Sequence, residues 1–390
     1  MQSRTAALSD GAAMAGGVVG VARAHRGSIS LFPVLIMIRK INTIAFVIII
    51  LCGGAALLWR LSKAGQLFTH TVTSSSWLDG GVTQALDERV AQAAPPDAHI
   101  NRVLNGLLFA VTGDPDPQVR SGCPGWLFLT EEVVETPGGE RNLLRRVELT
   151  RKLQADFEHR GIELVTVAVP DKVEQAAGEL CGLTVSRQAR GRRAAWQQAS
   201  EGLALHQVDL HSGWIAPGYW RTDSHWNRAG ASFAAQRVAV IARAFAPPGD
   251  SSMELQSAVA THARSGDLMR LAGIDRNTPP FAPPVDTDHE VQLVIHRSGS
   301  LLDNVAAPVV MLAGSSYSLN SGFIDYLQLG MKQEIAQQSR LGSGFAGSVL
   351  ELLKHHPERL DGIKLMIWEW PLRSLYQPLT DEENNYLAQP

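Results

Sequence analysis

Hydrophobic positions in the middle of the chain predict helices that alternate with buried strands. Over residues 142–159 the apolar side chains recur every three or four positions, near one face of a helix, and Gly161 ends it. The next run, residues 162–169, is apolar and β-branched and stops at Pro170, which is typical of a buried parallel strand. A second helix and strand are expected at residues 188–205 and 207–210.

The same alternation continues towards the C-terminus. Asn227 is a suitable N-cap for a helix whose apolar positions repeat every three to four residues up to Phe245. Residues 274–288 contain two Pro-Pro pairs and predict a loop that could wall a site. The remaining strands and helices are expected at residues 308–312, 320–329, 346–355 and 363–368. Strands that alternate with helices predict an α/β fold with a mainly parallel sheet.

An uncharged apolar run at residues 44–59 differs from everything that follows it. With its flanks it covers residues 41–61, about the 20 positions of a membrane-spanning helix, so we expect one transmembrane signal anchor. A cleaved signal peptide and a buried core helix are the alternatives. Arg39 and Lys40 precede the run, which predicts a single-pass protein of the cell inner membrane with its main domain in the periplasm.

The anchor divides the chain into four expected segments. Residues 1–40 are a cytoplasmic segment or lie ahead of the true start, because the sequence from Met37 looks like the natural beginning of a signal sequence. The other three segments are the anchor at 41–61, a polar stalk at 62–100 and a folded domain at 101–390.

Composition and charge narrow the function classes. Hydrophobic residues make up 45% of the chain, charged residues 19%, and the net charge is −3, so neither a disordered chain nor a broad nucleic-acid-binding surface is indicated. Of three cysteines, Cys52 lies in the apolar run, which leaves Cys123 and Cys181 in the exported part. In an oxidising compartment they could pair as a disulfide; two buried free thiols are the alternative.

A strand that runs into small residues near position 314 is the first candidate for chemistry. The sequence from Val309 continues through Gly314 to Ser316, just before a predicted helix. Such a turn exposes a hydroxyl at the carboxyl end of a strand, close to helix N–H groups that stabilise an oxyanion. A plain strand-to-helix connection with an N-cap is the ordinary alternative.

Asp223 and His225 stand two residues apart just before the helix capped by Asn227. His225 could accept the proton of Ser316, with Asp223 fixing its tautomer and stabilising the imidazolium. Asp-x-His also occurs in metal sites, but the sequence offers no further ligand pattern such as Cys-x-x-Cys. We therefore expect no metal, and without a phosphate-binding glycine motif, no nucleotide cofactor.

These candidates belong to a series of motifs spread over about residues 100–378. The series comprises residues 125–129, 169–172, 221–226, 266–268, 314–318, 342–344 and 367–373. In this order they resemble the AlgX/AlgJ-like alginate O-acetyltransferase family, a branch of the SGNH hydrolase-like proteins. The resemblance implies a mainly parallel sheet flanked by helices, and a triad of Ser316, His225 and Asp223 in permuted chain order.

The resemblance also implies a periplasmic enzyme that moves acetyl groups onto hydroxyls of an exopolysaccharide, alginate or another, through an acetyl-serine intermediate. Its implied partners are that polysaccharide, a membrane-bound O-acyltransferase as acetyl source, and an exopolysaccharide synthesis and secretion complex. A carbohydrate acetylesterase with the same triad is one alternative. A noncatalytic polysaccharide-binding scaffold subunit is the other.

Other residues of the motifs have less defined roles. Tyr317, Arg221 and Trp226 are candidates for substrate binding, although packing is the simpler reading of Trp226. Lys172 either lines the site or is a solvated loop lysine. Glu369 and Arg373 lie four positions apart, a spacing that allows a structural ion pair.

Overall fold

The computed structural model describes residues 98–389, with gaps at 115, 215 and 297–306, and before them only positions 44, 47, 48, 50–55 and 59. The chain forms two compact units, with the boundary after Pro96. Residues 1–40, most of the expected anchor at 41–61 and nearly all of the expected stalk lie outside the described residues. In the part of the chain that is described, no helix is both long enough and apolar enough to cross a membrane.

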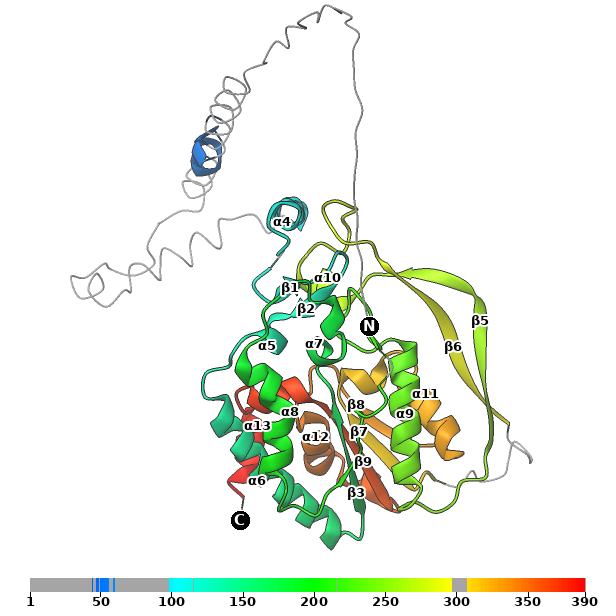
Figure 1. Ribbon diagram of the computed structural model, residues 1–390. Helices are drawn as coiled ribbons and strands as arrows, with labels where there is room; N and C mark the ends of the chain where they lie inside the picture. Colours follow the sequence, from blue (N-terminus) through cyan, green and yellow to red (C-terminus); the bar gives the residue numbers. More distant parts are fainter. Residues whose placement is uncertain are drawn as a thin grey trace, which may run out of the picture. The chain divides into compact units, whose positions relative to one another are not determined.

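Five parallel strands form the central sheet of the second unit (Figure 1). In spatial order they are β4 (His206–Gln207), β3 (Glu163–Val169), β9 (Leu365–Pro371), β7 (Val310–Gly314) and β8 (Ala336–Ser339). Every neighbouring pair is parallel. All residues of β7 and β9 are buried, as expected of strands with helices on both faces. The prediction of an α/β fold with a mainly parallel sheet is confirmed.

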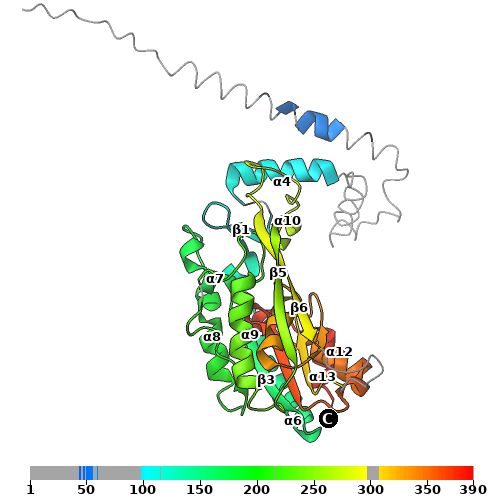
Figure 2. The same cartoon turned by 90° about the vertical axis from the view of Figure 1, so that its right-hand side faces the viewer.

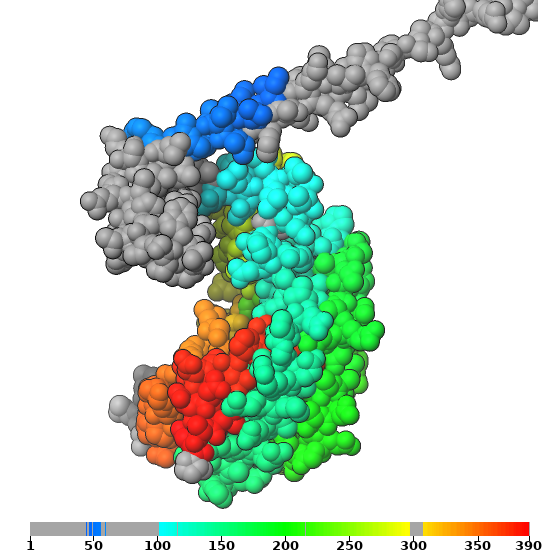
Figure 3. Space-filling model, turned by 90° about the vertical axis from the view of Figure 1, so that its left-hand side faces the viewer, coloured from blue at the N-terminus to red at the C-terminus, as the bar shows by residue number. Residues whose placement is uncertain are grey.

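Helices cover both faces of this sheet. Successive side chains of each strand point to opposite faces, so each strand packs against both helical layers. On one face Met366, Trp368 and Trp370 of β9 pack with helices α6 (Gly139–His159), α8 (Arg187–Ala199), α12 (Gly347–His355) and α13 (Asp381–Leu387). On the other face Leu365 and Ile367 pack with α9 (Arg228–Ala242) and α11 (Phe323–Met331). Figure 3 shows the outside of the first layer, where α13 (red) lies beside α6.

Shorter elements complete the described part of the domain. They are α4 (Ala98–Thr112), β1 (Val119–Ser121), β2 (Leu127–Leu129), α5 (Thr130–Val133), α7 (Lys172–Gln175), α10 (Asp267–Leu271) and the 3-10 helices η1 (Ala177–Glu179), η2 (Ser316–Leu319), η3 (Pro357–Leu360) and η4 (Leu372–Tyr376). A disulfide joins Cys123 to Cys181 and ties the loop after β1 to the one after η1.

A long antiparallel pair, β5 (Ser252–Arg264) with β6 (Asp286–His296), is absent from the sequence prediction. It stands beside α9 and α11 and is separate from the central sheet (Figures 1 and 2). The loop expected at residues 274–288 therefore ends three residues early, since β6 begins at Asp286. Most of β5 is exposed on both faces, so its sequence lacks the apolar alternation that identifies a half-buried strand.

Candidate active site

Ser316 follows the carboxyl end of β7, at the start of the 3-10 helix η2. Ser315 caps this helix, because its Oγ accepts a hydrogen bond from the Tyr317 N–H at 3.2 Å. Gly314 is required just before it, since a Cβ there would lie 2.1 Å from Ser318 Oγ. The turn thus places a half-buried serine hydroxyl at the edge of the sheet where α/β proteins bind ligands.

The loop before α9 brings an imidazole and a carboxylate to this serine. Nε2 of His225 lies 2.7 Å from Ser316 Oγ, and Nδ1 lies 2.6 Å from Asp223 Oδ1. The same Oδ1 accepts the backbone N–H of His225 at 2.9 Å. Asn227 caps α9 through the Gly230 N–H, as expected, and so fixes where the loop ends. The structure therefore brings the three residues of the expected triad together.

Asp223 is buried and is held as an anion. Its Oδ2 accepts hydrogen bonds from Arg264 Nη2 at 2.9 Å and from the Asp267 N–H at 3.1 Å. Burial alone would raise the pKa of Asp223, but the hydrogen bond and charge of His225, with Arg264, hold it well below its ordinary value. An ionised Asp223 is the state that orients and stabilises a protonated His225.

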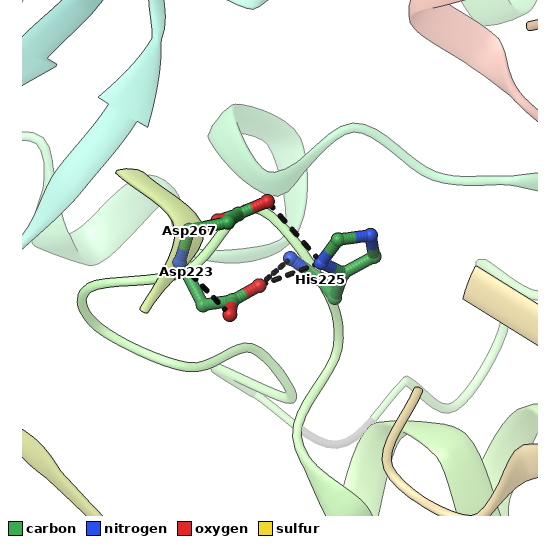
Figure 4. Close-up of side chains that lie close together, drawn as sticks. All are labelled: Asp223, His225 and Asp267. Carbon is green, nitrogen blue, oxygen red and sulfur yellow. Dashed lines mark hydrogen bonds and ion pairs between the residues drawn. The ribbon is translucent and has the colours of Figure 1, made fainter. Parts of the chain in front are cut away.

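Asp267 is a second carboxylate beside the imidazole, which the sequence reasoning did not assign. Figure 4 shows Nδ1 of His225 facing both Asp223 and Asp267, whose Oδ2 is 3.4 Å from that nitrogen. Asp267 also accepts hydrogen bonds from the N–H and from the Oγ of Ser224, each at 2.6 Å. The three side chains are spaced as metal ligands could be, but each facing atom is already engaged in hydrogen bonds. This arrangement fits an orienting network around the imidazole.

Comparison with known proteins places this site in a family. The family model described as "SGNH hydrolase-like domain, acetyltransferase AlgX" matches residues 119–372, which include every residue of the triad. The chain belongs to this family.

The chain is also similar to named relatives and, in fold, to a solved structure. The chain is 27% identical over 338 residues to the "Probable alginate O-acetylase AlgJ" of Pseudomonas aeruginosa, covering 80% of this chain and 83% of the relative. It is 25% identical over 326 residues to the protein of that name from Pseudomonas putida, covering 79% and 83%. The solved O-acetyltransferase domain of Pseudomonas putida AlgJ shares the fold, with a TM-score of 0.60, 22% identity and coverage of 70% of this chain and 98% of that one.

Two residues expected at the substrate are enclosed by the protein in this AlgX-type domain. Trp226 is fully buried and stacks on Phe323, with ring centroids 4.9 Å apart. Tyr317 is also fully buried; its hydroxyl donates to Ser224 O at 2.8 Å and accepts from Arg373 at 2.9 Å. Neither ring offers a surface to a substrate in this structure. Both instead pack around His225 and its loop.

Arg221, the third candidate for substrate binding, remains partly exposed. Its Nε lies 3.0 Å from Asp286 Oδ1, and Nη2 donates to Val285 O at 3.1 Å. The pair joins the loop of the Asp–His motif to the first residue of β6, so the unpredicted β5–β6 pair contributes to the frame of the site.

Lys172 is neither a solvated loop lysine nor a site-lining one. It is fully buried, and Nζ donates to three backbone carbonyls: Leu127 at 2.6 Å, Arg221 at 3.0 Å and Asp223 at 2.9 Å. Burial lowers the pKa of Lys172 to about 8, against the attraction of Glu132 and Asp223. The sequence signal for its role is its place three positions after the end of a buried strand.

The expected pairing of Glu369 with Arg373 is wrong. Arg373 instead forms ion pairs with Glu131 at 2.7 Å and Glu132 at 3.3 Å. Burial, together with the charge of Asp171, raises the pKa of Glu132 to about 7. Glu369 points instead to the turn that carries Ser316. Position 369 lies in a strand, where a spacing of four has no helical meaning. A lone carboxylate in the run Leu-Met-Ile-Trp-Glu-Trp was the available signal of a buried acceptor.

Proposed function

We propose that this protein is a serine acyltransferase that carries acetyl groups to the hydroxyls of an exopolysaccharide outside the cytoplasm. The observation that carries the proposal is the continuous contact from Asp223 through His225 to Ser316, at 2.6 and 2.7 Å. Membership of the AlgX-type acetyltransferase family supports it. Relatives named alginate O-acetylase favour alginate or a similar polymer as acceptor.

The reaction proceeds in two half-reactions. Ser316 Oγ attacks the carbonyl carbon of an acetyl ester, His225 Nε2 takes the hydroxyl proton, and the proton passes to the leaving alcohol as the acetyl–oxygen bond breaks. A sugar hydroxyl then enters, gives its proton to His225, and its oxygen attacks the acetyl-serine carbonyl. The sugar ester leaves, and the proton returns to Ser316.

The turn itself supplies a donor for the oxyanion formed in each half-reaction. Within residues 315–318 the N–H groups of Ser315 and Ser318 bond to Glu369, and that of Tyr317 bonds to Ser315. Among the described residues no acceptor is found for the Ser316 N–H. That N–H is therefore the group of the turn left to stabilise negative charge on the acetyl oxygen.

The same proposal includes the organisation of the chain. Residues 41–61 anchor it in the inner membrane, 62–100 form a stalk, and the domain from 101 onwards acts in the periplasm within a polysaccharide synthesis complex. A membrane-bound O-acyltransferase delivers the acetyl group across the membrane. A reporter enzyme fused after residue 100 is expected to be active only outside the cytoplasm; activity inside would overturn the topology.

The chemical test separates transfer from hydrolysis. The full chain in detergent is mixed with p-nitrophenyl acetate and with mannuronate or cellulose oligosaccharides, and p-nitrophenol, acetylated sugar and free acetate are measured separately. The proposal expects acetylated sugar, lost in S316A. Acetate equal to the p-nitrophenol released, whatever the sugar, would identify an esterase, and no Ser316-dependent turnover would identify a scaffold.

A further inference from the structure

Glu369 is a buried carboxylate in the middle of the central sheet. It belongs to β9, of which every residue is buried, and its side chain is 1% exposed. The neighbouring side chains Trp368 and Trp370 point to the opposite face and belong to the apolar core there. An acid in such a strand is costly unless its oxygens are fully hydrogen-bonded.

All four hydrogen bonds of this carboxylate come from the turn after β7. Oε2 accepts the Ser315 N–H at 2.8 Å, the Ser318 N–H at 3.2 Å and the Ser318 Oγ at 2.7 Å. Oε1 accepts the Ser315 Oγ at 2.8 Å. Ser315, just before Ser316, and Ser318, two positions after it, are therefore bound to one side chain of the adjacent strand.

The bonding pattern matches an ionised acid. A carboxylate offers about four acceptor sites and no donor, and the turn presents four donors and needs no acceptor from Glu369. Burial raises the pKa of Glu369, while the hydrogen bonds from Ser318 and Ser315 oppose that rise. Among the described residues no cation pairs with it, so the four donors are its stabilising partners.

The backbone on the other side of the turn is held as firmly. Gly314 O accepts from the Arg340 N–H at 3.1 Å, from Ser343 Oγ at 3.3 Å and from Ser348 Oγ at 2.6 Å. A Cβ at Gly314 would lie 2.8 Å from Glu369 Oε2, so the glycine allows the carboxylate to approach. Between these two anchors the only side chain of residues 315–318 that reaches His225 Nε2 is Ser316.

We propose that Glu369 is the positioning residue of the nucleophile turn: by accepting four hydrogen bonds from Ser315 and Ser318, it holds Ser316 Oγ in line with His225 and leaves the Ser316 N–H free for the oxyanion. Glu369 acts through its neighbours and does not touch the reacting atoms. The inference rests on the proposed role of Ser316 as nucleophile. It adds a residue to the machinery that lies outside the triad and 53 positions after the serine.

Replacement variants separate the parts of this role. Leucine in E369L removes both acceptor oxygens, so three of the donors lose their partner and the Ser318 N–H keeps only its bond to Ser315 O, and the turn relaxes. Glutamine in E369Q retains one oxygen for the three donors on Oε2, and its amide faces Ser315 Oγ, which must turn from donor to acceptor. S318A removes the shortest of the four bonds, the one of 2.7 Å, and adds no group.

The experiment measures the single-turnover rate at which the full chain is acetylated by p-nitrophenyl acetate, together with the KM for that donor. A misplaced nucleophile costs rate and leaves donor binding intact, so E369L is expected to lose about 100-fold in rate with KM within about twofold. E369Q and S318A are expected to lose about tenfold each. Failure of E369L to fold leaves these two variants as the test.

Glu383 provides a matched control. It is also a buried carboxylate, 1% exposed, but it binds Arg146 at 2.8 Å and caps α13, away from the triad. E383Q is expected to lower the melting temperature while the acetylation rate stays within about twofold. Rates of folded E369Q and S318A within about twofold of wild type would overturn the positioning role. If S316A also kept its rate, the proposed function itself would be wrong.

Discussion

The two regions that meet at the site are held in opposite ways. The Ser316 turn continues a strand of the central sheet and is fixed by a buried acceptor, Glu369, on the adjacent strand. The loop of Asp223 and His225 lies outside the sheet and is fixed by a buried donor, Lys172, which binds its carbonyls. The nucleophile is thus placed by a side chain of the neighbouring strand in the sheet, and the base by contacts with segments outside the sheet.

The loop has further ties of the same long-range kind. Asp286 accepts the N–H and Oγ1 of Thr222 at 2.9 and 2.7 Å, across 64 positions of sequence. Asp267 does the same for Ser224, from 43 positions away. The position of Ser316 therefore depends on one pair of neighbouring strands, whereas the position of His225 depends on several loops at once.

Removing the contact between the two regions is expected to reduce acetylation more than any other change. His225→Ala takes away the base that Ser316 needs, so the rate of Ser316 acetylation is expected to fall about 10⁴-fold. His225 is buried against Tyr317 and bonded to the buried Asp223, so a lower melting temperature is also expected. Rapid-quench kinetics measure the rate. A folded variant that retains a tenth of the activity would show that another group takes the proton.

Asp223→Asn tests whether the loop's acid orients the imidazole. Asparagine keeps the size but loses the charge that stabilises the imidazolium, so a loss of about 10³-fold is expected, smaller than that of His225→Ala. The double variant should be no slower than His225→Ala alone, because the acid acts through the histidine. Losses that multiply in steady-state assays would contradict this order of action.

Lys172→Met removes the buried ammonium that donates hydrogen bonds to the loop of Asp223 and His225. Three carbonyls lose this donor, although Arg221 O keeps the hydrogen bond from the Leu127 N–H, and the expected cost is about 3 kcal/mol in the free energy of unfolding and about 30-fold in acetylation rate. Denaturant titration and single-turnover kinetics measure the two. Lys354→Met, at an exposed position near the end of α12, is the control and should stay within about 0.5 kcal/mol. If Lys172→Met were as stable as Lys354→Met, Lys172 would not be needed to hold the loop.

Raising the pH is the mildest change to the same lysine. Because the folded pKa of about 8 lies below the unfolded value, the unfolded chain binds more protons above pH 8, and this group makes the free energy of unfolding rise with pH. The neutral amine, however, has one donor too few for three carbonyls, so acetylation should fall about threefold from about pH 7 to about pH 9.5. An equal fall in Lys172→Met would assign the pH effect to another group.

The same contrast explains what the sequence could reveal. Alternating helices and apolar strands predicted the parallel sheet, and the small residues after a strand pointed to Ser316, because both signals are local. The role of Lys172 depends on carbonyls 45 to 51 positions away, and that of Glu369 on a turn 51 to 54 positions earlier. Most of β5 is exposed, so little of its sequence shows the apolar alternation of a half-buried strand. Trp226 and Tyr317 were candidates for substrate contact because they adjoin His225 and Ser316 in sequence, yet these rings fill the space behind His225.

If Ser316 holds the acetyl group during transfer, mass spectrometry of the quenched full chain should detect it there. After a brief mixing with p-nitrophenyl acetate, one acetyl group is expected on the peptide that contains Ser316. It should be absent in S316A and should disappear, with formation of acetylated sugar, when an acceptor oligosaccharide is added. Acetylated sugar formed at the wild-type rate by S316A, or by a wild-type enzyme that never carries acetyl on Ser316, would show that Ser316 is not the acetyl carrier.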